Sequence, residues 1–289
     1  PEDSRDMETL KKYADFALYQ VKHSHKGCLQ EFSMESYRRE AQTAQLRRDF
    51  QQLLTEERVY YMFQPIFSAY DGRVMAYEAL MRSDMERLRS PATIMKLARE
   101  QGAMQEIERL TFFKSLETFD HLRSEGLVRR DALLFINSIA SIALPQEDCE
   151  YMDSRWHELL RQVVIEITEE EAIDREAIAL DDYGSGYSNE GSLLELSPRF
   201  IKVDLTIIRG IDTDPDKQQI VQNIVAYAHP RSMQIIAEGV ETAEELKKVL
   251  ELGVDGLQGY FLAKPANIPT RIAPVARQII ENSHSSDCG

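Results

Sequence analysis

Eight short apolar segments constrain the fold of this chain more than any other feature. They are Val59–Phe67, Val74–Met81, Ala132–Ile136, Val163–Ile167, Ala177–Leu180, Phe200–Val203, Gln234–Ala237 and Gly256–Leu262. Each runs into a polar or acidic residue or carries one near its end. Several are separated by stretches with the apolar period of an α-helix, at Ala92–Gln101, Ile107–Leu122, Lys217–Ala228 and Ala243–Leu252.

Strands that alternate with helices favour a parallel sheet, and eight of them favour a closed (β/α)₈ barrel of the TIM type. A doubly wound open sheet is the alternative. It is weaker because no glycine-rich phosphate loop follows the first strand. We therefore predict an α/β barrel preceded by a short helical segment.

Size and charge agree with this fold class. The 289 residues suffice for one large barrel or two ordinary domains, and 43% hydrophobic residues supply a sizeable core. The formal net charge of -15 argues against binding of a nucleic acid polymer. It still permits a small phosphate substrate, because bound metal ions invert the local field.

The cysteines and the ends of the chain bear on its location. Cys28, Cys149 and Cys288 are far apart, which is typical of free thiols in a reducing, cytoplasmic compartment. No apolar run has the length of a membrane span, and no signal peptide is visible. Because the chain starts at Pro1, we expect a fragment of a longer protein that could be membrane-anchored upstream.

The first forty or so residues differ from the rest. Asp6–Val21 has a helical apolar pattern, and Met34–Glu56 is a charged stretch without Pro or Gly that predicts a connecting helix. We place a boundary near residue 42.

One interval does not fit a regular barrel. Only ten residues separate Ile167 from Ile178, whereas a parallel crossover with its helix needs roughly 10–12 or more. We expect a helix to be missing here.

Polar residues at the strand ends predict the site, because the carboxyl ends of barrel strands meet at one face. They are Glu78, Asn137, Glu166, Asp181, Asp182, Lys202, Glu238, Glu241 and Gln258. Any one of them alone is more simply a surface or turn residue, but their joint position at strand ends is hard to ascribe to chance. Hard oxygen ligands of this kind suit Mg²⁺ or Mn²⁺. Zinc would more often use His or Cys ligands, and no histidine falls in these motifs.

The motifs resemble those of a known family. They are Phe63-Gln64-Pro65, Tyr77-Glu78-Ala79-Leu80-Met81-Arg82, Phe135-Ile136-Asn137, Glu166-Ile167-Thr168-Glu169, Asp181-Asp182-Tyr183-Gly184-Ser185-Gly186, Lys202-Val203-Asp204, Glu238-Gly239-Val240-Glu241 and Gln258-Gly259-Tyr260. In this order, from about Leu46 to Ala266, they resemble the EAL domain, a phosphodiesterase module that hydrolyses cyclic di-GMP. The resemblance implies a modified barrel whose first strand is antiparallel to the second.

The resemblance also implies two metal ions and their ligands. The first ion would be held by Glu78, Asn137, Glu166 and Asp181. Asp181 would bridge to the second ion, helped by Asp182 and Glu238.

Further roles are implied for residues around the metals. Lys202 would position the attacking water and Glu238 would act as general base, with Gln258 and Glu241 as supports. Glu169 would hold the loop 183–189. The dinucleotide would contact Gln64, Leu80, Arg82 and Pro265. The guanidinium of Arg82 suits a phosphate, since it makes paired charged hydrogen bonds.

The N-terminal piece is similar to the closing segment of a GGDEF domain, the diguanylate cyclase module. The signature of that module is absent from the sequence, so cyclase activity is not assigned to this chain. We thus divide the chain into residues 1–42, the end of a GGDEF-like domain with its linker helix, and residues 43–289, the EAL barrel.

The expected activity is metal-dependent hydrolysis of cyclic di-GMP to linear pGpG. A catalytically silent cyclic di-GMP receptor is the first alternative, and a purely structural barrel that mediates dimerisation is the second. The resemblance further implies a homodimer formed through the barrels and a GGDEF-like or sensor domain upstream.

Overall fold

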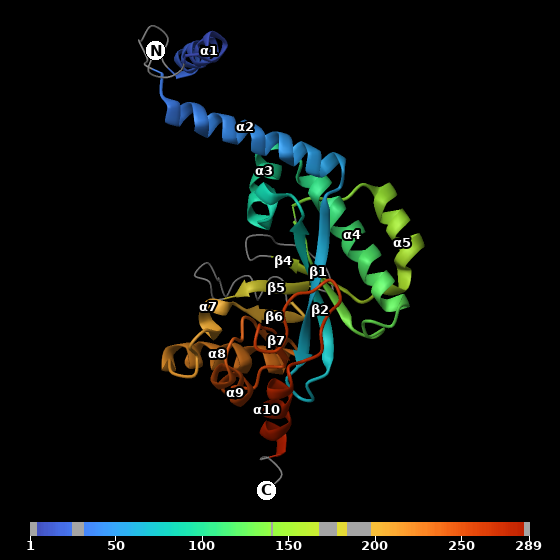
Figure 1. The fold of residues 1–289 in the computed structure, drawn as a ribbon. Helices are drawn as coiled ribbons and strands as arrows, with labels where there is room; N and C mark the ends of the chain where they lie inside the picture. Colours follow the sequence, from blue (N-terminus) through green and yellow to red (C-terminus); the bar gives the residue numbers. More distant parts are fainter. Residues whose placement is uncertain (1–4, 25–31, 140, 168–177, 184–197, 286–289) are drawn as a thin grey trace.

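The strands form a closed eight-stranded barrel in the computed structural model, which describes residues 5–24, 32–139, 141–167, 178–183 and 198–285 (Figure 1). Their order around the barrel is the order in the chain. They are β1 (Val59–Ser68), β2 (Val74–Ser83), β3 (Leu133–Asn137), β4 (Val163–Ile167), β5 (Ile178–Tyr183), β6 (Phe200–Val203), β7 (Gln234–Ala237) and β8 (Gly256–Leu257). The predicted barrel is confirmed, and the open sheet is excluded.

The first strand runs against its neighbours. β1 pairs antiparallel with both β2 and β8, and all the other neighbouring pairs are parallel. This confirms the antiparallel first strand implied by the family resemblance. Residue Val59, at the start of β1, lies opposite Ser83, at the carboxyl end of β2. The chain therefore enters the barrel at the end where the parallel strands finish.

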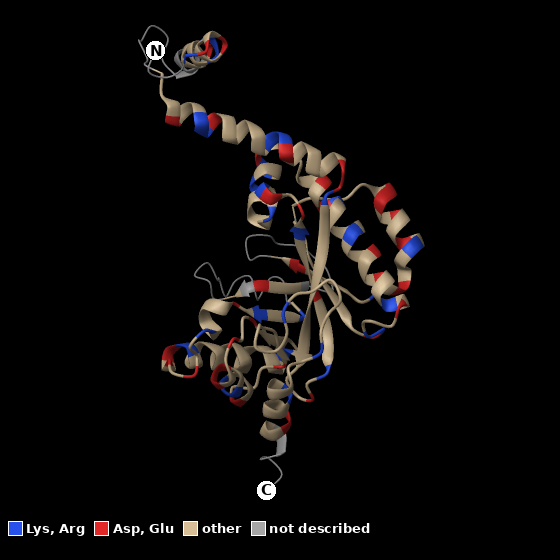
Figure 2. Cartoon of the chain, in the orientation of Figure 1, with Lys and Arg blue, Asp and Glu red and all other residues tan. Residues whose placement is uncertain are grey.

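Helices cover the outside of the barrel. They are α3 (Pro91–Gln101), α4 (Met104–Ser124), α5 (Gln146–Leu160), α7 (Leu205–Ile208), α8 (Pro215–Ala228), α9 (Ala243–Glu251) and α10 (Pro274–Ser285), with 3₁₀ turns η1 (Glu86–Leu88) and η2 (His229–Arg231). Figure 2 shows acidic and basic residues interspersed along several of these helices. No helix in the described part is long and apolar enough to cross a bilayer.

The predicted last strand was too long. The apolar pattern predicted a strand over Gly256–Leu262, but β8 ends at Leu257. The chain turns at Gly259, whose carbonyl accepts hydrogen bonds from the N–H groups of Leu262 and Ala263. A β-carbon at Gly259 would lie 2.1 Å from the carbonyl oxygen of Val240, so this close approach requires glycine.

Two helices precede the barrel, α1 (Met7–Ser24) and α2 (Met34–Thr55), as the sequence predicts. The end of α2 is anchored in the barrel, because Phe50 and Leu53 are fully buried in an apolar cluster shared with α3 and α4. Aromatic rings of Tyr13 and Tyr37 connect α1 to the start of α2 at 4.9 Å. The predicted boundary at residue 42 falls within α2 and stays a prediction.

The short connection between β4 and β5 joins two neighbouring parallel strands. Its ten residues, 168–177, lie outside the described part of the chain, as does the prediction of a missing helix. Cys149 is a free thiol, as expected, and the other two cysteines are likewise outside that part.

The barrel interior is built in two layers. The lower layer is apolar and nearly inaccessible to solvent: Ile66, Ala76, Phe135, Val164, Ala179, Phe200 and Ile236. Side chains alternate along a strand, so the residue two positions further along each parallel strand faces the same interior. Those residues are Glu78, Asn137, Glu166, Asp181, Lys202 and Glu238. A polar ring therefore lies on top of an apolar floor at the carboxyl end of the barrel.

Candidate active site at the carboxyl end of the barrel

Lys202 is the centre of the polar ring. Its side chain is 1% exposed, and its ammonium nitrogen Nζ lies within ion-pair distance of four carboxylates. The distances from Nζ are 2.6 Å to Glu166 Oε1, 2.6 Å to Glu238 Oε1, 3.0 Å to Asp181 Oδ1 and 3.5 Å to Glu78 Oε2. Strand ends that are far apart in the sequence thus meet at one cation.

Glu78 is held from both sides. The side-chain amide of Asn137 donates to its Oε1 at 3.2 Å, and that of Gln258 donates to its Oε2 at 2.6 Å. Gln64 faces Glu78 across the β1–β2 ladder, and its amide donates to the carbonyl of Ala263 at 3.2 Å. Three predicted site residues, from β1, from the end of β3 and from the position just after β8, therefore hold or border this one carboxylate.

The carboxylates keep the ammonium charged. Burial by itself would lower the pKa of Lys202, but the negative charges of Asp181, Glu166, Glu238 and Glu78 outweigh it and raise this pKa well above its ordinary value. Four ionised carboxylates around one ammonium would leave an excess of negative charge. Some of the carboxylates must therefore take up protons when no other cation is present.

Two carboxylates, Glu166 and Glu238, have a raised pKa and are the ones that take up these protons. Burial raises the pKa of Glu166 well above its ordinary value, and the neighbouring Glu78 adds to the effect although Lys202 opposes it. Burial likewise raises the pKa of Glu238 to about 8, again against the attraction of Lys202. Both acids thus lose their protons more readily when a further positive charge enters the ring.

The raised pKa of Glu238 predicts that the metal-free protein loses stability as the pH rises. The unfolded carboxyl titrates near 4.5 and the folded one near 8, so the folded state binds the extra proton between these values. The stabilising contribution is fully present below the unfolded pKa and is lost as the pH rises through the folded pKa. Urea unfolding in EDTA at about pH 6 and about pH 9 measures this loss, which reaches at most about 1.4 kcal/mol per pH unit for one proton.

The matched control for this prediction is Glu238→Gln, which keeps the shape of the side chain and cannot titrate. Its stability should depend less steeply on pH than that of the parent protein. Equal slopes for the two proteins would contradict a titrating Glu238.

Several buried oxygen atoms of the ring lack a hydrogen-bond donor or a cation of their own. Glu166 Oε2 and Gln258 Oε1 are buried without a hydrogen-bond partner, and Glu166 Oε1 and Asp181 Oδ1 are met only by the ammonium of Lys202. Such atoms are costly unless a cation or water satisfies them. In the described residues no three His, Cys, Asp or Glu side chains already stand at the spacing of a metal cage. The carboxylates converge on the ammonium instead, and the donor set is one that Mg²⁺ or Mn²⁺ prefers.

A pocket of about 470 Å³ adjoins the ring. It is lined by Glu78 and Asn137, by apolar side chains such as Met81, Met95 and Ile107, and by charged ones such as Arg99 and Glu108. The predicted substrate-binding residues Leu80 and Arg82 line the same pocket. A flat group placed here would lie beside the carboxylate of Glu78.

The other predicted substrate contacts come from opposite ends of the chain. Pro265 precedes Ala266, which forms a two-hydrogen-bond bridge with Phe63 of β1. Gln64 follows Phe63 and is 7% exposed. The bridge therefore places Pro265 next to the strand that carries Gln64.

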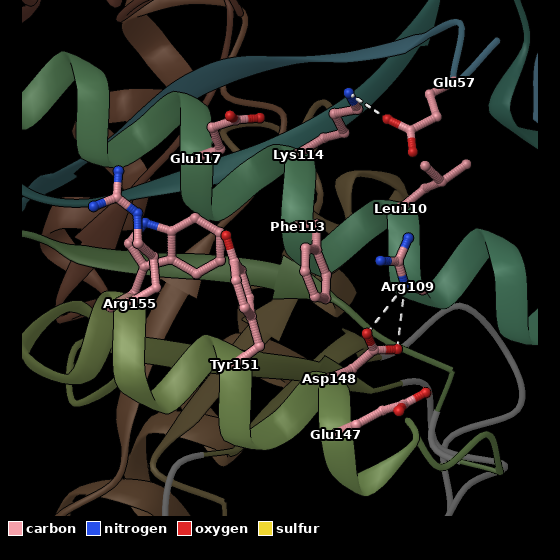
Figure 3. Close-up of a pocket in the computed structure, with 11 residues that line it drawn as sticks. Glu57, Arg109, Leu110, Phe113, Lys114, Glu117, Glu147, Asp148, Tyr151 and Arg155 are labelled. Carbon is pink, nitrogen blue, oxygen red and sulfur yellow. Dashed lines mark hydrogen bonds and ion pairs between the residues drawn. The ribbon is translucent and has the colours of Figure 1, made fainter.

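A second pocket, of about 520 Å³ between α4 and α5, is unrelated to the ring (Figure 3). It is lined by aromatic rings and charged side chains, and it contains no predicted site residue. The lining residues are Glu57, Arg109, Leu110, Phe113, Lys114, Glu117, Glu147, Asp148, Tyr151, Arg155 and Trp156. Several of its charges already pair with each other, as Lys114 does with Glu57 at 2.7 Å. The polar ring, with its orphaned oxygens, is the stronger candidate.

Not every predicted residue joins the ring. Glu241 lies beyond it, where its carboxylate pairs with Arg209 at 2.7 Å. Glu169, the loop 184–189 and the side chain of Asp182 lie outside the described part of the chain. The roles assigned to these residues stay predictions.

Two buried carboxylates near the site were not predicted. Glu108 on α4 is 2% exposed and accepts hydrogen bonds from Ser138 Oγ and from the backbone N–H of Ile139, at 2.5 Å and 3.1 Å. Glu245 on α9 is 3% exposed. The spacing Thr242-x-x-Glu245 is a capping-box signal readable from sequence, whereas nothing in the sequence marks Glu108 as buried.

Comparison with known proteins identifies a family and several relatives. The sequence model of the EAL domain matches residues 47–265. Cyclic di-GMP phosphodiesterase PdeR of Escherichia coli is 27% identical over 285 residues, which cover 92% of this chain and 42% of the relative. The chain thus spans less than half the length of this relative.

The chain is also similar to solved structures of proteins in complex with cyclic di-GMP. The PaMucR phosphodiesterase in complex with cyclic di-GMP is 27% identical, with a TM-score of 0.64, and the match covers 77% of this chain and 97% of the other. The BlrP1 protein of Klebsiella pneumoniae, in a manganese and cyclic di-GMP complex, is 25% identical with a TM-score of 0.62. That match covers 74% of this chain and 58% of the other.

Proposed function

Because this chain belongs to the EAL domain family, we propose that it hydrolyses cyclic di-GMP to linear pGpG with the help of divalent metal ions. The observation that carries the proposal is the ring of four carboxylates around buried Lys202. The carbonyl and carboxylate oxygens orphaned in this ring support a metal site, and the adjoining pocket supports a substrate with flat bases.

The residues present fit two ions of Mg²⁺ or Mn²⁺. Glu78, Asn137, Glu166 and Asp181 would hold the first ion, and Asp181, Asp182 and Glu238 would hold the second. When bound, such ions lower the pKa of water and offset negative charge on phosphoryl oxygens. The relative solved with manganese and cyclic di-GMP supports a divalent metal of this kind.

Three protein side chains would accept the proton, position the water and bind the phosphate. Glu238 would accept the proton of the attacking water, because positive charge from a bound ion would favour its ionised form over the protonated form that burial favours. Lys202, whose Nζ lies 2.6 Å from Glu238 Oε1, would position that water. Arg82, at the edge of the pocket, would bind a phosphate oxygen pair.

The test is a chromatographic assay of the purified protein with cyclic di-GMP, with Mg²⁺ or Mn²⁺ against EDTA. Metal-dependent formation of pGpG supports the proposal. Intact nucleotide at saturating metal contradicts it, because every described member of the acid set is present.

A receptor is the second candidate, and the ten-residue connection between β4 and β5 favours it. A crossover this short is at the lower limit for parallel strands, and an error of about 1 Å in position costs much catalytic rate. Binding of cyclic di-GMP without hydrolysis, measured by calorimetry in Mg²⁺ or Mn²⁺, would establish the receptor.

We also propose a homodimer formed through the barrels, a cytoplasmic location, and a GGDEF-like or sensor domain upstream in the parent protein. A polymeric nucleic acid is not among the proposed partners. Light scattering of the purified chain tests the dimer, with a monomer as the contrary result.

A further inference from the structure

The turn after β7 carries Glu238, and its backbone is held tightly. Gly239 has a φ of +68°, and a β-carbon there would lie 2.6 Å from Leu205 Cβ. The N–H of Val240 donates to the carbonyl of Gln258 at 3.0 Å, which ties the turn to the chain after β8. The position of Glu238 thus depends on its neighbours on both sides.

Glu245 binds this turn with a buried carboxylate. Its Oε2 accepts hydrogen bonds from the N–H groups of Glu241 and Thr242, at 2.8 Å and 3.0 Å. Its Oε1 accepts a third, at 2.8 Å, from the N–H of Gly210. Burial alone would raise the pKa of Glu245, but these backbone donors outweigh it and lower the pKa, so the carboxylate stays ionised.

The third hydrogen bond links two strand ends. Gly210 follows α7, which begins three residues after Lys202 of β6. Glu241 comes three residues after Glu238 of β7. One carboxylate therefore joins the segment after Lys202 to the segment after Glu238, and these two side chains meet at 2.6 Å.

We propose that Glu245 is a positioning residue that sets the placement of Glu238 relative to Lys202, and through it the metal affinity of the ring. The inference rests on the proposed function. A capping box would explain only the hydrogen bond from the N–H of Thr242, since Glu241 precedes the cap and Gly210 belongs to another segment. The bond to Gly210 lies outside α9 and adds nothing to the start of that helix.

Two substitutions separate the helix cap at the start of α9 from the link, by which we mean the hydrogen bond between Glu245 and Gly210. In Glu245→Gln the single amide oxygen keeps the two N–H groups of the turn, and the amide nitrogen then faces the N–H of Gly210. This variant retains the cap and loses the link. Thr242→Ala does the reverse, because it removes the hydroxyl that accepts from the N–H of Glu245 at 3.1 Å and leaves the link intact.

The experiment measures Mn²⁺ affinity by calorimetry, kcat and KM with cyclic di-GMP, and Tm in EDTA, for both variants and the parent. We expect Glu245→Gln to weaken Mn²⁺ binding and lower kcat by about 10–100-fold, with KM nearly unchanged, because residues behind metal ligands have effects of this size. Thr242→Ala should lower Tm and leave Mn²⁺ affinity and kcat close to those of the parent.

A Glu245→Gln variant with parental Mn²⁺ affinity and kcat would overturn the inference and leave Glu245 as a helix cap. If Glu245→Gln fails to fold, Glu245→Asp, which keeps the charge but shortens the reach to Gly210, takes its place under the same criteria. If the parent binds Mn²⁺ but does not hydrolyse cyclic di-GMP, the proposed function fails, and Mn²⁺ affinity alone decides the role of Glu245.

Discussion

Glu78→Ala is expected to reduce hydrolysis of cyclic di-GMP by at least about 100-fold, while the barrel stays folded. The substitution removes a carboxylate that is 7% exposed and that would ligate the first metal. It also leaves the side-chain amides of Asn137 and Gln258 without their acceptor. In the metal-free protein the loss of one of four negative charges around a single ammonium should offset part of the cost of these unpaired amides, so the barrel should stay folded.

Turnover, Mn²⁺ affinity and urea unfolding of Glu78→Ala together check this expectation. Glu78→Gln is the matched control for volume: it fills the same space and keeps one acceptor, but it lacks the charge. Both variants should be inactive if the charge matters. Wild-type turnover in Glu78→Ala would remove the basis of the proposed function.

Lys202→Met is expected to lower the unfolding free energy of the metal-free protein by about 3–5 kcal/mol. The ammonium is 1% exposed, and methionine, which has a similar length, leaves the carboxylates around it without any cation. Breaking a buried ion pair by removing one partner is costly because an uncompensated charge remains. Saturating Mn²⁺ should return part of the lost stability, since the ion supplies positive charge to the same acids.

Urea unfolding in EDTA and in Mn²⁺ measures both effects. Lys248→Met is the control, because Lys248 also pairs with an acid, Glu251, but on the surface, where such pairs contribute about 0–1 kcal/mol. Equal losses for the two variants would mean that the buried ammonium adds no more to stability than a surface pair does.

The strand-end residues were predictable because alternation along a strand is independent of the rest of the fold. Ala76 and Glu78, or Phe200 and Lys202, must face the same side of their strand wherever that strand lies. The convergence of the acids on Lys202 was not predictable, because it depends on the register of the neighbouring strands.

Helix α5 lies outside the helices that the apolar pattern predicts. Its buried positions are only Met152, Trp156 and Leu159, and the backbone at Trp156 departs from helical angles, with φ -129° and ψ 28°. Helix α9, after β7, was predicted from the sequence, but one of its contacts was not. Thr242 and Glu245 form a local capping signal, yet the contact of Glu245 with Gly210 spans 35 residues and follows from tertiary structure alone.

The reversed direction of β1 decides where the N-terminal helices meet the barrel. Since Val59 lies beside the carboxyl end of β2, α2 arrives at the face that holds the polar ring. Its residues Phe50 and Leu53 share an apolar cluster with Ile107, which also lines the pocket beside the ring. A movement of α2 would therefore act on Ile107, in the wall of the pocket beside the polar ring. The apolar layer beneath the polar ring belongs to a different cluster from the one that holds Phe50, Leu53 and Ile107.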